Sequence, residues 1–340
     1  MTTNSTPSPA LSIIVPHRNH KNALPGLLDS VLAQSLRQVE VVVIDDCSDE
    51  SCADVVEGYR GKGLDVRLFE QTERLYKINA RLAGIEHARA EALMFADADD
   101  ILWGTTALEE HLKIFHDRDT DIVHFRSVLI NNDDTFRQYF FWADPFAPEL
   151  HGNTIFNAWL AGTLEGSTIW NKMFSRGLLL DKIPAMRNTD IRYVDDFFLN
   201  VYLLFHARKY VGSDRVGYGY RHQDKRESNS FHRAAACLLA TEVCAAYLRK
   251  HACPLEAIDL FEQKMAEFIC VAVGRGCLAL PIGDDGIGHT DAAVEALTSQ
   301  VGAKELIKLL LLGNRQNAMK IQTIFNTIYR PFMNVSEFKK

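Results

Sequence analysis

The chain has 340 residues, of which 47% are hydrophobic and 24% are charged. This is the composition of a globular protein that is large enough for one sizeable domain and a smaller one. The formal net charge of −7 argues against broad nucleic-acid binding, which requires many Lys and Arg side chains to neutralise phosphates. The sequence holds no run of about 18 apolar residues, so it predicts no membrane span. Residues 1–10 are polar, lack the features of a signal peptide, and are expected to form a short disordered lead.

The sequence contains seven cysteines, an odd number, and none of them forms a C-x-x-C pair. Cys237 and Cys244 are seven residues apart, as are Cys270 and Cys277, so each pair falls near one helix face. We expect the cysteines to be small buried hydrophobic residues in a reducing cytoplasm rather than metal ligands or disulfides.

The first hundred residues alternate short apolar runs with segments of helical periodicity. Strands are expected at residues 11–15, 39–44, 66–69 and 92–96, and helices at residues 23–36, 51–59 and 75–90. Short apolar strands separated by helices predict an α/β fold with a mostly parallel sheet covered on both faces. Ligands of such sheets bind beyond the carboxyl ends of the strands, where the polar clusters of this sequence occur.

The pattern loosens after Trp103. We expect a helix at residues 105–116, a strand at 122–130, an irregular aromatic-rich stretch at 131–151, a helix at 196–208, and one or two strands at 209–220. From about residue 231 the chain reads as helical, with one Gly-rich break at residues 283–288. The predicted organisation is a catalytic domain at 11–230, divided into halves at 11–103 and 104–230, followed by a helical region at 231–340.

Three carboxylates occur within four residues at the end of the predicted strand 92–96. Asp97, Asp99 and Asp100 repel one another at the mouth of a buried strand, so a partner must offset that repulsion. A divalent cation does so, and oxygen ligands suit Mg²⁺ or Mn²⁺. The alternative is a solvated acidic turn that caps the next helix. We place Asp97 and Asp99 at a metal site, with Asp100 as an indirect partner of the metal or a helix cap.

Asp45 and Asp46 follow the second predicted strand directly. A carboxylate at this point can accept hydrogen bonds from a nucleobase or from ribose hydroxyls. An Asx turn followed by the N-cap of the next helix would explain the same residues. Both interpretations stay open from these residues alone.

Three segments, SIIVPHRN, VEVVVIDDCSDES and INARLAGIEHARAEALMFADADD, resemble in order and spacing the family 2 glycosyltransferases of the GT-A fold. In that family the acids after the second strand bind the base and ribose, and the D-x-D binds the metal and the diphosphate. The resemblance, over residues 11–103, therefore implies that Asp97 and Asp99 hold the cation and that Asp97 contacts the nucleotide. It implies further nucleotide contacts for Pro16, His17, Arg18, Asp45, Asp46 and Arg81. The sequence departs from the family pattern at His17, Cys47, Leu82 and Ala96, and Cys47 requires a turn that tolerates a side chain.

Three later segments, IWNKMFSRGLLL, DIRYVDDFFLNVYLL and VGYGYRHQDKRES, also resemble this family. In the family the second acid of an E-D pair acts as the catalytic base, which implies that role for Asp196, with Asp195 in the place of Glu. A sugar hydroxyl is a weak nucleophile, and a carboxylate within reach can take its proton. The alternative is that these acids cap the helix that starts at Phe197, a role we favour for Asp195.

Four more residues are candidate donor or acceptor contacts, together with Asp195. Trp170 could be a sugar platform or a buried core residue. Lys172 could face the diphosphate or solvent. Arg221 and His222 could approach the leaving phosphate, and a histidine could complete the metal shell, although a solvated loop explains His222 as well.

Residues 319–333 carry apolar side chains at helical spacing with basic residues nearby. Such a helix could lie on an anionic membrane surface near lipid-linked acceptors, although packing against the catalytic domain explains the pattern as well. The protein is expected in the cytoplasm, or peripheral at the inner face of the membrane.

The predicted activity is transfer of a sugar from a nucleotide-sugar, with UDP as the expected nucleotide, to a saccharide or lipid-linked acceptor, with inversion. The cofactor is Mn²⁺ or Mg²⁺, and the pathway expected from family habit is bacterial surface polysaccharide or glycolipid synthesis. Two alternatives remain: a nucleotidyltransferase on a similar scaffold, and a non-catalytic module that binds nucleotide-sugars. The absence of a Gly-rich basic loop near the first strand counts against the former, and the intact acids count against the latter.

Overall fold

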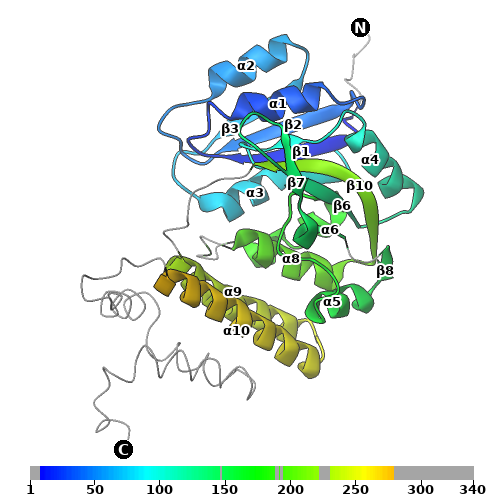
Figure 1. The fold of residues 1–340 in the computed structure, drawn as a ribbon, viewed down its shortest axis with the longest axis vertical. Helices are drawn as coiled ribbons and strands as arrows, with labels where there is room; N and C mark the ends of the chain where they lie inside the picture. The colour runs from blue at the N-terminus through cyan, green and yellow to red at the C-terminus, as the bar shows by residue number, and fades with distance from the viewer. Residues whose placement is uncertain (1–7, 146–147, 188–190, 192–193, 222–229, 279–340) are drawn as a thin grey trace, which may run out of the picture. The chain divides into compact units, whose positions relative to one another are not determined.

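The computed structural model describes residues 8–145, 148–187, 191, 194–221 and 230–278 (Figure 1). Contacts divide the chain into two compact units, Met1–Gln223 and Asp224–Lys340. The sequence placed its boundary near residue 230. The predicted helix at 319–333, the break at 283–288 and most of the predicted lead lie outside the described residues, as does His222.

The first unit is built on one mixed sheet in the order β3-β2-β1-β4-β9-β6-β10-β5, with β7 paired to β6 and β8 paired to β10. The strands are β1 (Leu11–His17), β2 (Val39–Asp45), β3 (Asp65–Glu70), β4 (Ala92–Phe95), β5 (Ile101–Leu102), β6 (Ile122–Ile130), β7 (Phe136–Tyr139), β8 (Glu149–His151), β9 (Lys172–Ser175) and β10 (Lys209–Arg221). Strands β3, β2, β1 and β4 are parallel neighbours, so their carboxyl ends share one edge. The predicted α/β fold with a mostly parallel sheet in its first half is confirmed.

Helices cover both faces of this sheet. They are α1 (Leu24–Leu32), α2 (Ala53–Gly61), α3 (Tyr76–His87), α4 (Ala107–Asp117), α5 (Asn153–Leu160), α6 (Arg176–Leu180), α7 (Ile183–Met186) and α8 (Asp195–His206), with a 3₁₀ turn η1 (Phe141–Ala143). Figure 1 shows α1 and α2 on one side of β1 and β2, and α3 on the other.

Alternation along β2 explains the two layers. Val41 and Val43 belong to the core cluster that includes α1 and α2, whereas Val42 and Ile44 pack with Ala80 of α3. Both faces are buried, as expected of parallel strands that read as continuous apolar runs. Gly84 lets α3 lie directly on β1, since a Cβ there would meet Ile14 Cγ2 at 2.3 Å.

Two expectations for the second half were incomplete. Residues 131–151, predicted as irregular, contain β7, η1 and β8. Strand β9 was not predicted, and it lies antiparallel between β4 and β6. Four residues are too few to show a period, and this strand depends on its two neighbours for its hydrogen bonds. The predicted strand at 209–220 is the single long strand β10.

The described part of the second unit is a helix pair, α9 (Ser230–Lys250) and α10 (Leu255–Leu278). Cys244 and Leu248 of α9 and Phe261 and Met265 of α10 are buried. Among the helices that the structure describes, none is long and apolar enough to cross a membrane.

The cysteines follow the prediction with one exception. Cys52, Cys237, Cys244 and Cys253 are buried and form no disulfide, whereas Cys47 is exposed. The side chains of Cys270 and Cys277 lie outside the described part.

Candidate active site

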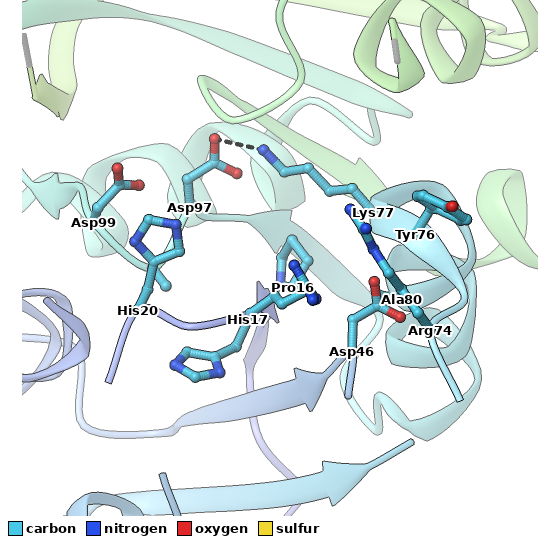
Figure 2. A pocket seen from close by; sticks show the side chains of 12 residues that line it. Pro16, His17, His20, Asp46, Arg74, Tyr76, Lys77, Ala80, Asp97 and Asp99 are labelled. Atoms are coloured by element: carbon cyan, nitrogen blue, oxygen red, sulfur yellow. Dashed lines mark hydrogen bonds and ion pairs between the residues drawn. The ribbon is translucent and has the colours of Figure 1, made fainter. Parts of the chain in front are cut away.

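A pocket of about 280 Å³ opens at the carboxyl ends of β1, β2 and β4 (Figure 2). Three strand ends and the first turn of α3 build it, since all of them meet at this edge of the sheet. It is lined by Pro16, His17, Arg18, His20, Asp46, Arg74, Tyr76, Lys77, Ala80, Asp97, Ala98 and Asp99. The sequence rule that ligands bind beyond the strand ends therefore located the pocket.

The two acids after β2 have different surroundings. Asp46 lines the pocket, and its Oδ1 accepts a hydrogen bond from the backbone N of Leu75 at 2.5 Å. Asp45 is buried, and its Oδ1 accepts from the backbone N and the hydroxyl of Ser48, at 3.0 and 2.6 Å. His17 Nδ1 lies 3.7 Å from the other oxygen of Asp45. Asp45 therefore shapes the turn, while Asp46 faces the pocket.

The turn after Asp46 holds a side chain in a backbone conformation that favours glycine. Cys47 has φ = 59°, in the left-handed region that glycine adopts at little cost. Its side chain is exposed to solvent. This turn therefore tolerates a side chain at the position where the family has Gly.

Arg81 is a buried junction between the two halves of the site. Its Nη1 donates to both Asp195 and Asp196, and its Nη2 lies 3.3 Å from Asp97 Oδ1. The side chain of Arg81 is fully buried, whereas those of Asp195 and Asp196 are 13% and 21% exposed. One guanidinium thus joins the acid after β4 to the acids that begin α8.

Burial and charge compete at these groups. Burial alone would raise the pKa of Asp97, but Lys77 and Arg81 outweigh it and lower that pKa. At Asp196, burial raises the pKa, with Asp195 acting in the same direction and Arg81 opposing it. A raised pKa suits a carboxylate that accepts a proton.

Asp195 was expected to cap α8, and that expectation was wrong. The N-cap position is Val194, without a capping hydrogen bond from its side chain. Asp195 is the first helical residue, and its carboxylate accepts from Arg81 instead. Both acids lie in the first turn, where the helix dipole favours negative charge.

Asp97 and Asp99 both line the pocket, in the turn after β4. Lys77 Nζ lies 2.9 Å from Asp97 Oδ2 (Figure 2). An ammonium therefore stands where a cation is expected, beside hard oxygen donors of the type that Mn²⁺ and Mg²⁺ prefer. The donor set fits a divalent cation.

Asp100 holds this turn in place from behind. Its two oxygens accept from the backbone N of Arg221 at 2.7 Å and from the Tyr218 hydroxyl at 2.8 Å. The same hydroxyl accepts from the backbone N of Asp97 at 3.0 Å. Asp100 is therefore an indirect partner of the candidate metal site, which was one of its two predicted roles.

Arg221 has a different role from the predicted phosphate contact. Its Nε donates to the backbone oxygen of Asp99, and its other nitrogens bind the backbone oxygens of Asn131 and Asn132 and the carboxylate of Asp134. Arg221 thus ties the D-x-D turn to the turn between β6 and β7.

Trp170 is a buried core residue, which was the second of its two predicted roles. It is 4% exposed and stacks on Phe140, Tyr218 and Tyr220, with ring centroids 4.8–5.8 Å apart. A platform for a sugar needs an exposed face, and this ring has none. Its contact with Tyr218 supports the residue that binds Asp100.

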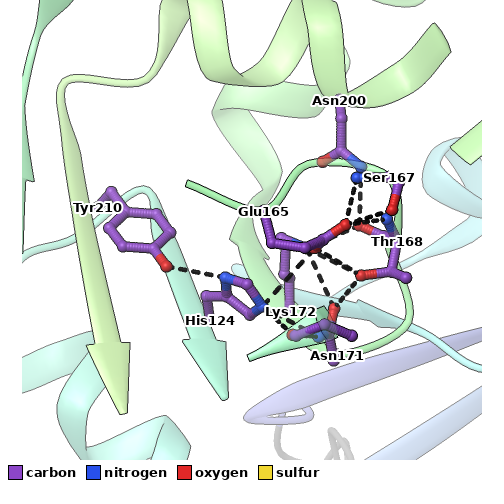
Figure 3. Close-up of polar contacts among 9 residues, drawn as sticks. His124, Glu165, Ser167, Thr168, Asn171, Lys172, Asn200 and Tyr210 are labelled. Atoms are coloured by element: carbon purple, nitrogen blue, oxygen red, sulfur yellow. Dashed lines mark hydrogen bonds and ion pairs between the residues drawn. The ribbon is translucent and has the colours of Figure 1, made fainter. Parts of the chain in front are cut away.

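Lys172 faces neither the pocket nor solvent (Figure 3). It is fully buried, and its Nζ lies 3.0 Å from Glu165 Oε2 and 2.7 Å from the backbone oxygen of Thr168. Asn200 of α8 donates to the same oxygen of Thr168 at 2.7 Å. The prediction of a diphosphate contact is corrected: Lys172 belongs to a buried network under α8.

Sequence reasoning missed four polar residues of the pocket, His20, Arg74, Tyr76 and Lys77. A signal was present for Lys77, because it stands four residues before Arg81 within α3, whereas Arg74 precedes that helix. A spacing of four residues puts Lys77 and Arg81 on one side of a helix that starts at the pocket edge. The missed partner of Lys172, Glu165, lies in a loop and has no periodic signal.

This fold, with acids at the carboxyl ends of β2 and β4, is the GT-A fold of glycosyltransferases. Residues 12–180 match the family described as Glycosyl transferase family 2, and the chain belongs to this family.

Two solved proteins show the same fold. The chain is 24% identical over 223 residues to the poly(ribitol-phosphate) beta-N-acetylglucosaminyltransferase TarS of Staphylococcus aureus, covering 64% of this chain and 36% of TarS. The crystal structure of S. aureus TarS 1-349 in complex with UDP matches with a TM-score of 0.52 and 18% identity, over 78% of this chain and 87% of that one. The mannosyltransferase PcManGT from Pyrobaculum calidifontis, in complex with GDP-Man and Mn²⁺, matches with a TM-score of 0.54 and 19% identity, over 90% and 87%.

Proposed function

We propose that this protein transfers a sugar, with inversion, from a nucleotide-sugar to an acceptor hydroxyl, and that the donor is a UDP-sugar. The observation that carries the proposal is the Arg81 junction. It joins Asp97, in the donor pocket, to Asp196, the residue proposed as base, so that donor and acceptor chemistry meet at one point. A pocket for binding alone has no need of a second, half-buried acid pair at that point.

The pocket divides into a nucleotide end and a phosphate end. Asp46, with Pro16 and His17, is proposed to take the base and ribose, where a carboxylate accepts from N–H and O–H groups. Arg18, Arg74 and Lys77 supply positive charge for the diphosphate. Asp45 acts through Ser48 and His17, whose positions it determines.

Asp97 and Asp99 would hold the divalent cation. Such an ion supplies charge neutralisation for the departing nucleoside diphosphate. The structure supports this on its own terms, because Asp97 already binds the cationic Lys77 at 2.9 Å. In the mannosyltransferase of similar fold, Mn²⁺ is bound together with GDP-Man.

Asp196 is proposed as the general base. It removes the proton of the acceptor hydroxyl while the hydroxyl oxygen bonds to the anomeric carbon and the nucleoside diphosphate leaves from the opposite face. Asp196 is the more exposed of the two acids, at 21% against 13% for Asp195. Asp195 orients Arg81 and keeps the base in position.

Exposed aromatic rings supply a surface for a saccharide acceptor. Phe136, Tyr139 and Phe141 are 47%, 43% and 62% exposed, and neighbouring ring centroids lie 5.3 and 5.8 Å apart. Trp103, which follows the D-x-D turn, lies 6.2 Å from Phe136 and continues the row. Aromatic rings with polar edges nearby suit sugars, which have one apolar face and many hydroxyls.

The pathway proposed is bacterial surface polysaccharide or glycolipid synthesis. Relatives include a teichuronic acid and an amylovoran biosynthesis glycosyltransferase. The chain spans only 36–44% of these proteins and of TarS, so the assignment is drawn from their names and the matched region alone.

The deciding experiment is transfer or donor hydrolysis with UDP-sugars and Mn²⁺ or Mg²⁺. Turnover is expected to stop in EDTA and in Asp99→Ala, and to release UDP rather than pyrophosphate. Asp196→Asn is expected to abolish transfer while UDP binding persists. Undiminished turnover in EDTA would contradict the metal role, and pyrophosphate release would favour a nucleotidyltransferase.

A further inference from the structure

Asp97 carries two cationic partners of different character. Arg81 approaches Oδ1 from a fully buried position, and its guanidinium is also bound by Asp195 and Asp196. Lys77 approaches Oδ2 with a side chain that is 40% exposed and lines the pocket. The Arg81 guanidinium is therefore held in place by three carboxylates. The Lys77 ammonium, in contrast, can move on its flexible four-carbon side chain.

Resting on the proposed function, we propose that Lys77 is a movable counter-ion. In the empty pocket its ammonium occupies the side of Asp97 that a divalent cation needs. When the cation and the donor bind, Lys77 moves to the diphosphate.

The charges of the pocket require such an exchange. Oδ2 of Asp97 cannot keep an ammonium at 2.9 Å and accept a divalent cation at the same point, because the two positive charges repel each other. Arg81 cannot be the group that leaves, because its departure would break its ion pairs with Asp195 and Asp196 as well. Lys77 can leave, because its ammonium is within the pocket that phosphate oxygens would enter.

This exchange couples metal binding to nucleotide binding. Without nucleotide, the metal must displace Lys77 into water. With nucleotide, the displaced ammonium gains a phosphate partner, so each ligand raises the affinity for the other by the same factor. Lys77 would thereby discourage metal binding to an empty pocket.

The test is a Mn²⁺ titration followed by electron paramagnetic resonance, alone and with saturating UDP or GDP. The variants are Lys77→Met, which removes the charge, and Lys77→Arg, which keeps it. Lys62→Met is the matched control, because Lys62 is a surface residue paired with Asp29 at the end of α2. Thermal unfolding of each variant establishes that it is folded.

Lys77→Met is expected to bind Mn²⁺ alone up to about fivefold more tightly than the wild type, the scale of a partly exposed ion pair. UDP should then strengthen Mn²⁺ binding less than it does in the wild type, and UDP itself should bind more weakly. Lys77→Arg and Lys62→Met should resemble the wild type in Mn²⁺ binding without nucleotide.

Equal Mn²⁺ affinity in Lys77→Met and the wild type would overturn the inference, as would unchanged coupling to UDP. If Asp99→Ala abolishes Mn²⁺ binding while Lys77→Met changes nothing, the metal site stands and only the role of Lys77 falls. If no form binds Mn²⁺ with either nucleotide, the metal part of the proposed function falls too.

Discussion

Arg81 donates a hydrogen bond to Asp196 across 115 residues of sequence. The pair joins α3, from the half of the chain that forms the donor pocket, to α8, from the half proposed to bind the acceptor. Because Arg81 also contacts Asp97, an acid on each side of the reaction shares one buried cation. The relative position of Asp97 and Asp196, the proposed base, is thus set by a single side chain.

Replacing Arg81 by Met is expected to remove both stability and activity. Three carboxylates would lose their buried partner, and breaking a buried pair costs about 3–5 kcal/mol of unfolding free energy. Urea unfolding measures the loss. The double variant Arg81→Met/Asp195→Asn should recover part of it, since one of the unpaired charges is removed. If Arg81→Met were as stable as the wild type, the proposal that Arg81 stabilises the fold through its three carboxylate partners would be wrong.

The acids of this site were predictable from sequence, but their connection was not. Asp46, Asp97 and Asp99 follow strands whose apolar runs are easily read, and parallel strands bring their ends to one edge. The contact between Arg81 and Asp196 depends on how α8 packs, which no local pattern encodes. The family resemblance pointed to Arg81 as a donor contact, whereas its contacts in the structure are with protein acids.

Lys172 is a second residue whose surroundings could not be predicted from the sequence. A lysine in a four-residue segment reads as exposed, and only the packing of β9 between β4 and β6 explains why it is buried. Its partner Glu165 compensates the charge. Burial alone would raise the pKa of Glu165, but Lys172 and His124 outweigh it and lower that pKa to about 2. A buried charge pair has no sequence period, so only the structure reveals it.

Lys172→Met is accordingly expected to affect stability rather than donor binding. It would leave the Glu165 carboxylate buried without its partner, at a cost of about 3–5 kcal/mol. Lys172→Met/Glu165→Gln should be more stable than the single variant. Chemical unfolding and UDP calorimetry separate the two effects at a temperature where the variant is folded. A large loss of UDP affinity with little loss of stability would contradict this expectation and indicate that Lys172 contacts the nucleotide.

Acid should destabilise the fold through His111. Burial lowers the pKa of His111 to about 4, from 6.5 in the unfolded chain. The unfolded state therefore binds more protons between these values, and the stability present above pH 6.5 is lost as the pH falls toward 4. The full loss is about 3 kcal/mol.

The variant His111→Phe tests this source of acid sensitivity. Its ring can keep the stacking on Phe125, where the centroids lie 4.4 Å apart, without taking up a proton. The unfolding free energy should then fall less steeply between pH 6.5 and 4, with a remaining slope from His124, whose pKa burial lowers to about 3. His116→Gln, an exposed position on the same helix, is the control. An unchanged slope in His111→Phe would assign the acid sensitivity elsewhere.

The last prediction concerns the exposed aromatic rings of Phe136, Tyr139 and Phe141, which are proposed to bind the acceptor. Phe141→Ala and Tyr139→Ala should each weaken transfer to a saccharide acceptor about threefold to tenfold, the range expected when one ring contact is lost. The loss should appear in the KM for the acceptor, because these rings are not among the residues that line the donor pocket. Donor hydrolysis by water should therefore be unchanged.

Phe141→Tyr, which keeps a ring, should retain transfer. Leu260→Ala removes an exposed apolar side chain from α10 and serves as the control for a general surface effect. If donor hydrolysis fell together with transfer, the rings would act on the donor pocket or on folding. If neither changed, the acceptor would lie on another surface. The comparison of transfer with hydrolysis thus distinguishes an acceptor surface from an exposed patch without a role in the reaction.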